Sequence, residues 1–214
     1  MVSVLRVGSE EQKQTMENKF KKFGGEEIAN VGEYLREYLK KYPNTSVYVG
    51  TDSKARRGKV TYATCICLYD EIRKDGVHYI FKRDAEIGKL DIFSRMWREV
   101  EKSVEVAEML EVELEGHLKR YSIEDLMVMR NPAGGYYKVN QNKLVGIDVD
   151  INPVPDGGKN QSNVAYESAK GYVVGLGYRE RFKTQGAWAA QCAADMCCKN
   201  VGRKKGKKFL KRAA

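Results

Sequence analysis

Three strand-like segments follow one another in this chain with only short turns between them, and no other feature restricts the fold as strongly. Residues 46–51, 60–69 and 77–83 are rich in β-branched and aromatic residues, and the turns between them read KARRG and RKDG. Consecutive strands joined by short turns pair antiparallel, because a parallel pair needs a long crossover connection. The sequence therefore predicts an antiparallel meander.

Helices and strands alternate after this meander. The hydrophobic period predicts a helix over 91–118, a strand over 144–151, a helix over 162–176, a strand over 178–183 and a last helix over 187–199. Before the meander, apolar residues recur at helical spacing from Ile28 to Tyr42, and Pro43 ends that helix. The predicted fold class is therefore α/β, with a mixed five-stranded sheet flanked by helices.

The domain organisation follows from the same pattern. Residues 26–199 form the predicted domain, and 119–142 within it have no clear period and are interpreted as an insertion. Residues 1–25 form an N-terminal arm, with a polar helix that starts at the capping box of Ser9 and Gln12 and ends at Gly24. Residues 200–214 form a basic C-terminal tail.

Composition indicates a folded, basic protein. Hydrophobic residues make up 42% of the 214 residues, which is enough for a core, and the formal net charge is +9. A basic balance favours a polyanionic partner, usually nucleic acid and less often an anionic membrane, although it can also serve solubility alone. The seven basic residues among 203–212 suggest a mobile arm that neutralises phosphates, with a solvated tail as the alternative.

Targeting and redox signals point to the cytosol. No apolar run approaches the roughly 20 residues that span a bilayer, and the first residues lack the apolar region of a signal peptide. The five cysteines are odd in number and contain no C-x-x-C pair, so we expect reduced, mostly buried thiols. The predicted location is therefore cytoplasmic, with no membrane partner.

Acidic residues stand at unusual places in two of the strands. Asp52 lies at the end of the first strand, where sites form in α/β sheets, although Asp-Ser-Lys is also ordinary turn chemistry. Asp148 and Asp150 point to one face of the fourth strand and interrupt its run of Leu, Val and Ile. An exposed sheet edge is the alternative explanation for this pair.

Two helices carry further acids. Glu99 falls seven residues from both Ile92 and Val106 and therefore on the apolar face of its helix. A carboxylate there is costly unless it is paired or binds a metal, so the alternatives are a boundary salt bridge and a ligand. Asp195 lies among small apolar residues of the last helix, as a ligand or as a surface aspartate.

These acids together fit hard divalent cations, which prefer oxygen ligands. Carboxylates from two strands and two helices can converge on one site. A pair of such ions clamps the attacking and leaving oxygens of a phosphodiester and activates a water. The basic surface would then hold the backbone of a nucleic-acid substrate.

The order of elements, with acids at these places, resembles the ribonuclease H-like superfamily. More narrowly, the segments GTDSK, DINP and AAD, together with Arg95-Met96 before Glu99 and GLGY before Lys183, resemble the bacterial YkuK-like family. The resemblance covers residues 26–199. Thr184, where a proline often follows that lysine, and the long segment 119–142 depart from the family pattern.

The resemblance implies five site residues. Asp52, Glu99, Asp150 and Asp195 would be catalytic metal ligands, and Lys183 would lie near the site and contact phosphate. Asp150 is preferred over Asp148 because it precedes Ile-Asn, although Asp148 could be the ligand or support it. The cofactors would be two magnesium or manganese ions.

The sequence thus predicts a metal-dependent nuclease that hydrolyses nucleic-acid phosphodiesters. The first alternative is a non-catalytic nucleic-acid-binding module on the same fold, and the second is an interaction protein whose charge serves solubility. The sequence does not distinguish DNA from RNA, nor single-stranded, duplex, hybrid or branched substrates, nor endonuclease from exonuclease action. It also leaves the oligomeric state open.

Overall fold

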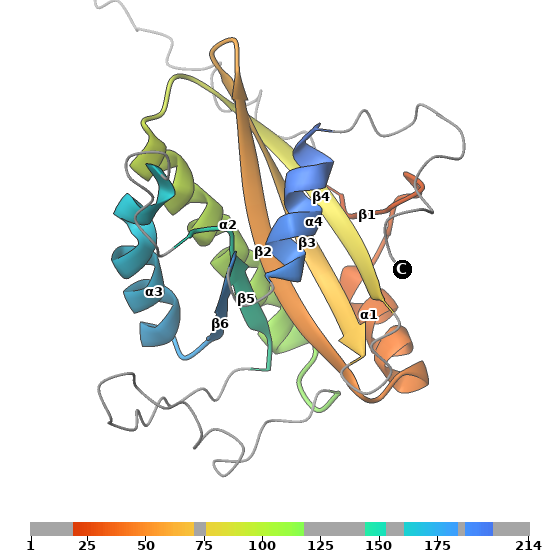
Figure 1. Ribbon diagram of the computed structural model, residues 1–214. Coiled ribbons are helices and arrows are strands. Elements are labelled where there is room, and N and C mark those ends of the chain that lie inside the picture. The colour runs from red at the N-terminus through yellow and green to blue at the C-terminus, as the bar shows by residue number, and fades with distance from the viewer. Residues whose placement is uncertain (1–18, 71–75, 118–143, 153–160, 184–186, 199–214) are drawn as a thin grey trace, which may run out of the picture.

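Six strands form one mixed sheet at the centre of the protein (Figure 1), in the order β1-β4-β3-β2-β5-β6. The structure is a computed structural model that describes residues 19–70, 76–117, 144–152, 161–183 and 187–198. The strands are β1 (Lys21–Lys22), β2 (Thr45–Arg56), β3 (Lys59–Asp70), β4 (Val77–Ile87), β5 (Gly146–Val149) and β6 (Arg179–Phe182). The helices are α1 (Val31–Lys41), α2 (Ile92–Glu113), α3 (Tyr166–Gly175) and α4 (Trp188–Cys198), with a 3-10 turn at Gln161–Ala165 before α3.

The predicted meander is confirmed. Strands β2, β3 and β4 pair antiparallel in chain order, while β5 and β6 run parallel to β2 at its other edge. The strands are longer than the sequence suggested, because β2 continues to Arg56 and only Arg57 and Gly58 form the turn. Both turn residues have positive φ, 52° and 74°, as a type I′ hairpin turn requires.

The sheet has one strand more than predicted. Lys21 and Lys22 pair with Phe81 and Ile80 at the outer edge of β4. The expected helix ending at Gly24 is therefore wrong for these residues, and its part before residue 19 lies outside the described residues. These two residues pair with the backbone of the edge strand β4, and the adjacent Phe20 is buried. The sequence pattern of a helix gives no sign of such a pairing.

Helices cover both faces of the sheet. One face packs under α1, α2 and α3, with β-strand residues such as Val49 and Ile66 against helix residues such as Leu35, Val100 and Leu110. The other face packs only under α4 among the described helices, and Figure 1 shows this helix in front of β2 and β3. The alternation of side chains along each strand feeds both cores.

Helix α4 approaches the sheet unusually closely. A Cβ added to Gly50 would lie 2.4 Å from the backbone nitrogen of Ala190, so only glycine leaves room at this position of β2. Alanines at 189, 190 and 193 supply the matching small surface on the helix. This contact fixes where the last helix crosses β2.

Two further expectations concern the environment of the protein. No helix in the described part of the chain is long and apolar enough to cross a membrane. The four cysteines whose side chains are described, Cys65, Cys67, Cys192 and Cys197, are thiols that form no disulfide, and the first two are buried. The insertion at 119–142 and the basic tail at 200–214 lie outside the described residues.

Candidate functional site

Two predicted aspartates lie where the parallel pairing of β2 with β5 ends. Strands β2 and β5 pair from Tyr48 opposite Gly146 to Thr51 opposite Val149. Asp52 and Asp150 are the residues that follow this pairing; β5 ends at Val149, whereas β2 continues past Asp52 to Arg56. The carboxyl ends of parallel strands at one sheet edge are the usual location of sites in α/β folds.

Glu99 reaches the same place from helix α2. Its side chain is 6% exposed, which confirms the predicted inward orientation. The hydroxyl of Ser53 donates a hydrogen bond of 2.6 Å to Glu99 Oε1. Because Ser53 directly follows Asp52, this bond holds the carboxylate of Glu99 beside the part of β2 that carries Asp52.

Electrostatics confirm that these carboxylates are close. Burial, with the charges of Asp52 and Asp150, raises the pKa of Glu99 to about 8, against the lowering effects of Ser53 and Arg95. Burial, with the charge of Asp150, raises the pKa of Asp52 to about 6, against the lowering effects of the Ser53 amide, Arg95 and Lys183. Neighbouring carboxylates thus make the ionisation of Asp52 and of Glu99 more costly.

Two basic residues partly offset this repulsion. Lys183 Nζ lies 3.0 Å from Asp150 Oδ1, and the lysine side chain is 55% exposed while the aspartate is 17% exposed. Arg95 stands one turn before Glu99 on α2 and lowers the pKa of both Asp52 and Glu99. The predicted neighbourhood of Lys183 and the acids is therefore present.

Hydrogen bonds among the hydroxyls of Ser103, Thr51 and Thr64 support the backbone next to the acidic group. Ser103 Oγ donates to Thr51 Oγ1 at 2.9 Å and also lies 2.9 Å from the carbonyl oxygen of Glu99. Thr51 and Thr64 share a further hydrogen bond of 3.0 Å between their hydroxyls. These buried bonds link α2 to β2 and β3 and restrict the backbone that carries Asp52 and Glu99.

Asp148 has a different environment from Asp150. Its two carboxylate oxygens accept hydrogen bonds from Arg181 Nε at 2.7 Å and Nη2 at 2.9 Å. Its Oδ2 also accepts from the backbone N–H of Ala189, in the first turn of α4, at 2.7 Å. With 1% exposure and three donors, Asp148 anchors β6 and α4 to β5.

Asp195 is exposed on helix α4. Its charge adds to the burial that raises the pKa of Cys65 on β3 and of Tyr79 on β4. On the same helix, Cys197 Sγ donates to the carbonyl oxygen of Asp52 at 2.8 Å. Helix α4 is therefore joined to the backbone of Asp52 through Cys197, and the role of Asp195 as a ligand stays a prediction.

Two residues of the cluster had no role in the sequence prediction. Ser53 and Arg95 both belong to segments that carried the family resemblance, but neither was assigned to the site. The spacing of Arg95 and Glu99, four residues apart on a helix, places them on one face and could have indicated Arg95. Ser53 could not have been found this way, since its contact joins β2 to α2.

The donor set fits a hard divalent cation in its chemistry. Asp52, Glu99 and Asp150 offer carboxylate oxygens, and burial together with neighbouring carboxylates raises the pKa of Asp52 and of Glu99, a cost that a bound cation would relieve. Within the described residues, however, no three or more His, Cys, Asp or Glu side chains are already arranged to hold one ion. A bound cation would compete with Lys183 for Asp150 and with Ser53 for Glu99.

Comparison with known proteins agrees with this architecture. Residues 30–199 match the family described as Ribonuclease H-like. The mixed sheet with helices on both faces is consistent with that fold. The chain therefore belongs to the ribonuclease H-like family. Neither the curated proteins nor the solved structures contain a match to it.

Proposed function

We propose that this protein is a divalent-metal-dependent nuclease that hydrolyses phosphodiester bonds of nucleic acid. The observation that carries the proposal is the convergence of Asp52, Glu99 and Asp150, from strand β2, the end of β5 and helix α2, where burial and neighbouring carboxylates oppose the ionisation of Asp52 and Glu99. Carboxylates kept together at such a cost are a mark of functional sites. The family and the net charge of +9 support a nucleic-acid substrate.

The residues would act in distinct ways. Asp52 and Asp150 would hold two magnesium or manganese ions, and Glu99 would complete the ligand set. Bound divalent ions supply a water nucleophile at neutral pH and neutralise charge on the phosphate. Lys183, released from Asp150, and Arg95 would contact phosphate oxygens and orient the scissile bond.

Asp195 can be separated from this ligand set. Asp195 is exposed on α4, and a site of Asp52, Glu99 and Asp150 alone would need no ligand from that helix. We therefore expect Asp195→Asn to keep most of the activity, whereas Asp52→Asn should abolish it. If Asp195→Asn instead abolishes cleavage without loss of stability, the four-acid ligand set implied by the family resemblance is the correct one.

A cleavage assay tests the proposal directly. Single-stranded, duplex, hybrid and branched substrates are incubated with the protein and either magnesium or manganese. We expect cleavage of at least one substrate, its loss in Asp52→Asn with binding nearly intact, and no change in Glu105→Gln, an exposed carboxylate of the same helix α2. Failure of both metals on every substrate would refute the nuclease.

The pairing of Asp150 with Lys183 favours one alternative, a binding module that does not cleave. In this pairing a lysine of the protein itself, in place of a metal ion, neutralises one of the three acids. Calorimetric titration with manganese separates the two functions. A nuclease should take up manganese with an affinity that falls at least tenfold in Asp52→Asn and Glu99→Gln. A binding module should retain nucleic acid without any carboxylate-dependent metal uptake.

A further inference from the structure

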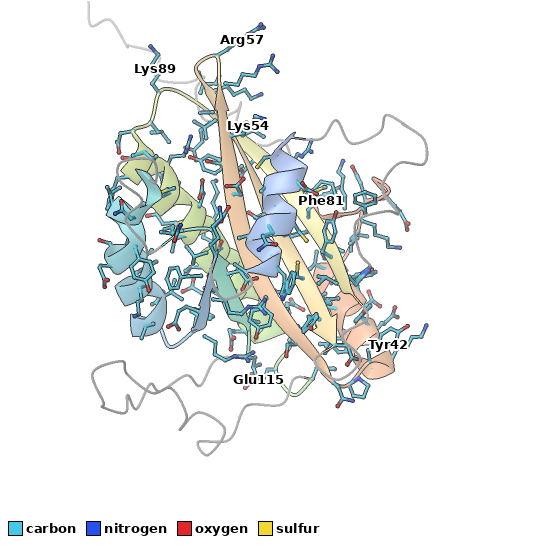
Figure 2. All side chains as sticks on the ribbon, in the orientation of Figure 1. Tyr42, Lys54, Arg57, Phe81, Lys89 and Glu115 are labelled. Carbon is cyan, nitrogen blue, oxygen red and sulfur yellow. The ribbon has the colours of Figure 1, made fainter. Side chains whose placement is uncertain are left out.

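The β2–β3 hairpin continues past the acidic site and carries a dense group of cations. Lys54, Arg56, Arg57 and Lys59 are all exposed, and they fall within six consecutive residues. The tip of this hairpin projects beyond α2 and α4 in Figure 1. Lys89 lies at the same end of the molecule as Arg57 (Figure 2).

Strand geometry places most of these cations on one face. Side chains two apart on a strand share a face, so Lys54 and Arg56 lie on the face of Asp52. Arg56 is directly opposite Lys59 in the antiparallel register, which puts Lys59 on that face as well. Four residues of strand span about 13 Å, so this row of cations starts at the acidic site and leads away from it.

The opposite face of the same strands is different. There Asp84 and Glu86 of β4 pair with Lys102 of α2, at 2.9 Å and 3.5 Å. By contrast, Arg56, Arg57 and Lys59 form no ion pair with any residue in the described part of the chain. The acids of β4 are thus on the face that α2 covers, while beyond Asp52 the other face of these strands carries Lys54, Arg56 and Lys59 and no acid.

An aliphatic side chain stands within this cationic row. Ile87 is 95% exposed and is the register partner of Lys59. Its face is therefore the face of Arg56 and Lys59. Cations around an exposed aliphatic group match a partner that combines negative phosphates with apolar base and sugar surfaces, and a purely anionic surface would leave Ile87 without a role.

We infer that the β2–β3 hairpin is a nucleic-acid-binding arm that holds the backbone of the substrate next to the acidic site. Its partner is the phosphate backbone of DNA or RNA, contacted by Lys54, Arg56 and Lys59, with Ile87 against bases or sugars. The identity of this partner rests on the proposed function. The span of about 13 Å from Asp52 to Arg56 corresponds to roughly four nucleotide steps of a helical strand, at about 3.4 Å each.

Binding in metal-free buffer tests the arm apart from cleavage. Fluorescence anisotropy of labelled single-stranded and duplex oligonucleotides gives the affinity of the full chain between 50 and 200 mM salt. We expect R56Q/K59Q to weaken binding about tenfold and to lower the salt slope by about 1.4 to 1.8, since each phosphate contact contributes about 0.7 to 0.9. The control K40Q/K41Q removes two exposed charges from α1 and should stay within about twofold of the wild type.

The outcomes separate the arm from the nuclease. Unchanged affinity and slope in R56Q/K59Q, with a wild-type melting curve, would overturn the arm even if the protein cleaves nucleic acid. Hairpin-dependent binding without cleavage would support the arm and refute the nuclease. Hairpin-dependent binding to anionic lipid vesicles, with none to nucleic acid, would overturn the inference.

Discussion

Individual carboxylates of this protein owe their properties to their surroundings. Glu99, Asp148 and Asp150 are all carboxylates, but their surroundings differ. Burial and neighbouring acids oppose the ionisation of Glu99, Arg181 binds Asp148, and Asp150 pairs with the exposed Lys183. Desolvation and unlike neighbours set which of them can exchange a partner for a cation. At the scale of single residues, the structure therefore ranks acids that look equivalent in the sequence.

The stability of the metal-free protein should depend on the charge of Glu99. Its pKa is about 8 in the folded state, against about 4.3 in an unfolded chain. The folded state therefore binds more protons between these values, and the free energy of unfolding falls as the pH rises through this window. The full loss is on the order of a few kcal/mol.

Urea unfolding with EDTA at pH 5 and pH 9 measures this effect. Glu99→Gln cannot ionise, so its stability should fall much less than that of the wild type over the same interval. Asp52 titrates in both proteins, and the difference between them isolates Glu99. Equal losses in the two proteins would contradict the prediction.

Substitution of Asp148 should lower the stability of the protein much more than substitution of Asp150. Asp148→Ala leaves the partly buried guanidinium of Arg181 without its carboxylate and removes the acceptor for the Ala189 N–H, so we expect a loss of about 3 to 5 kcal/mol. Asp150→Ala breaks only a pair with an exposed lysine, and stability should stay within about 1 kcal/mol. Chemical denaturation gives both values, and calorimetry with manganese should show the larger loss of uptake in Asp150→Ala.

At the scale of elements, the close contact between β2 and α4 defines one side of the site. Gly50 allows this approach, and Cys197 of α4 bonds to the backbone of Asp52 two residues further along β2. A shift of α4 would therefore move the backbone that carries Asp52. The packing of α4 thus matters to the acidic group independently of Asp195.

A pair of glycine substitutions checks this contact. Gly50→Ala places a methyl group against the backbone of Ala190 and should cost about 1 to 3 kcal/mol of stability. Gly171→Ala in α3 meets open space and should instead stabilise by about 0.5 to 1 kcal/mol, because alanine favours helix. Thermal unfolding of both variants gives the comparison. Equal effects of one sign would show that the close approach is not limiting.

At the scale of the whole molecule, positive charge is distributed unevenly. Residues 203–212 carry seven basic residues, and the β2–β3 hairpin carries four more close to the acidic site. Phosphate binding by such segments weakens steeply with salt, whereas charge that serves only solubility gives no such dependence. Two basic segments would act on different stretches of one nucleic acid.

Deletion of residues 200–214 separates these contributions. If the basic tail neutralises phosphates, its removal should lower the salt slope by several units, at about 0.9 for each lost contact, and weaken binding to every sequence equally. The melting temperature should not change, because the predicted domain ends at residue 199. Retention on DNA and RNA at varied salt measures the slope. An unchanged slope would mean that the tail is only solvated.

The sequence by itself determined the order of elements and the inward orientation of Glu99. Local periodicity specifies these features, since a three-strand run with short turns admits few pairings and a helix has a fixed angular spacing. The strand limits did not follow from this periodicity, because β2 continues past Asp52 to Arg56 and β5 ends at Val149, before Asp150. The edge strand β1 escaped prediction because two residues contain no period.

Only the tertiary structure decided which acids stand together. Asp148 and Asp150 share strand parity, but the partners that distinguish them come from β6 and α4. The bond from Cys197 of α4 to the backbone of Asp52, and the bond from Ser53 to Glu99, join elements far apart in the chain. Long-range packing fixes such angles and distances, and no local pattern of residues encodes them.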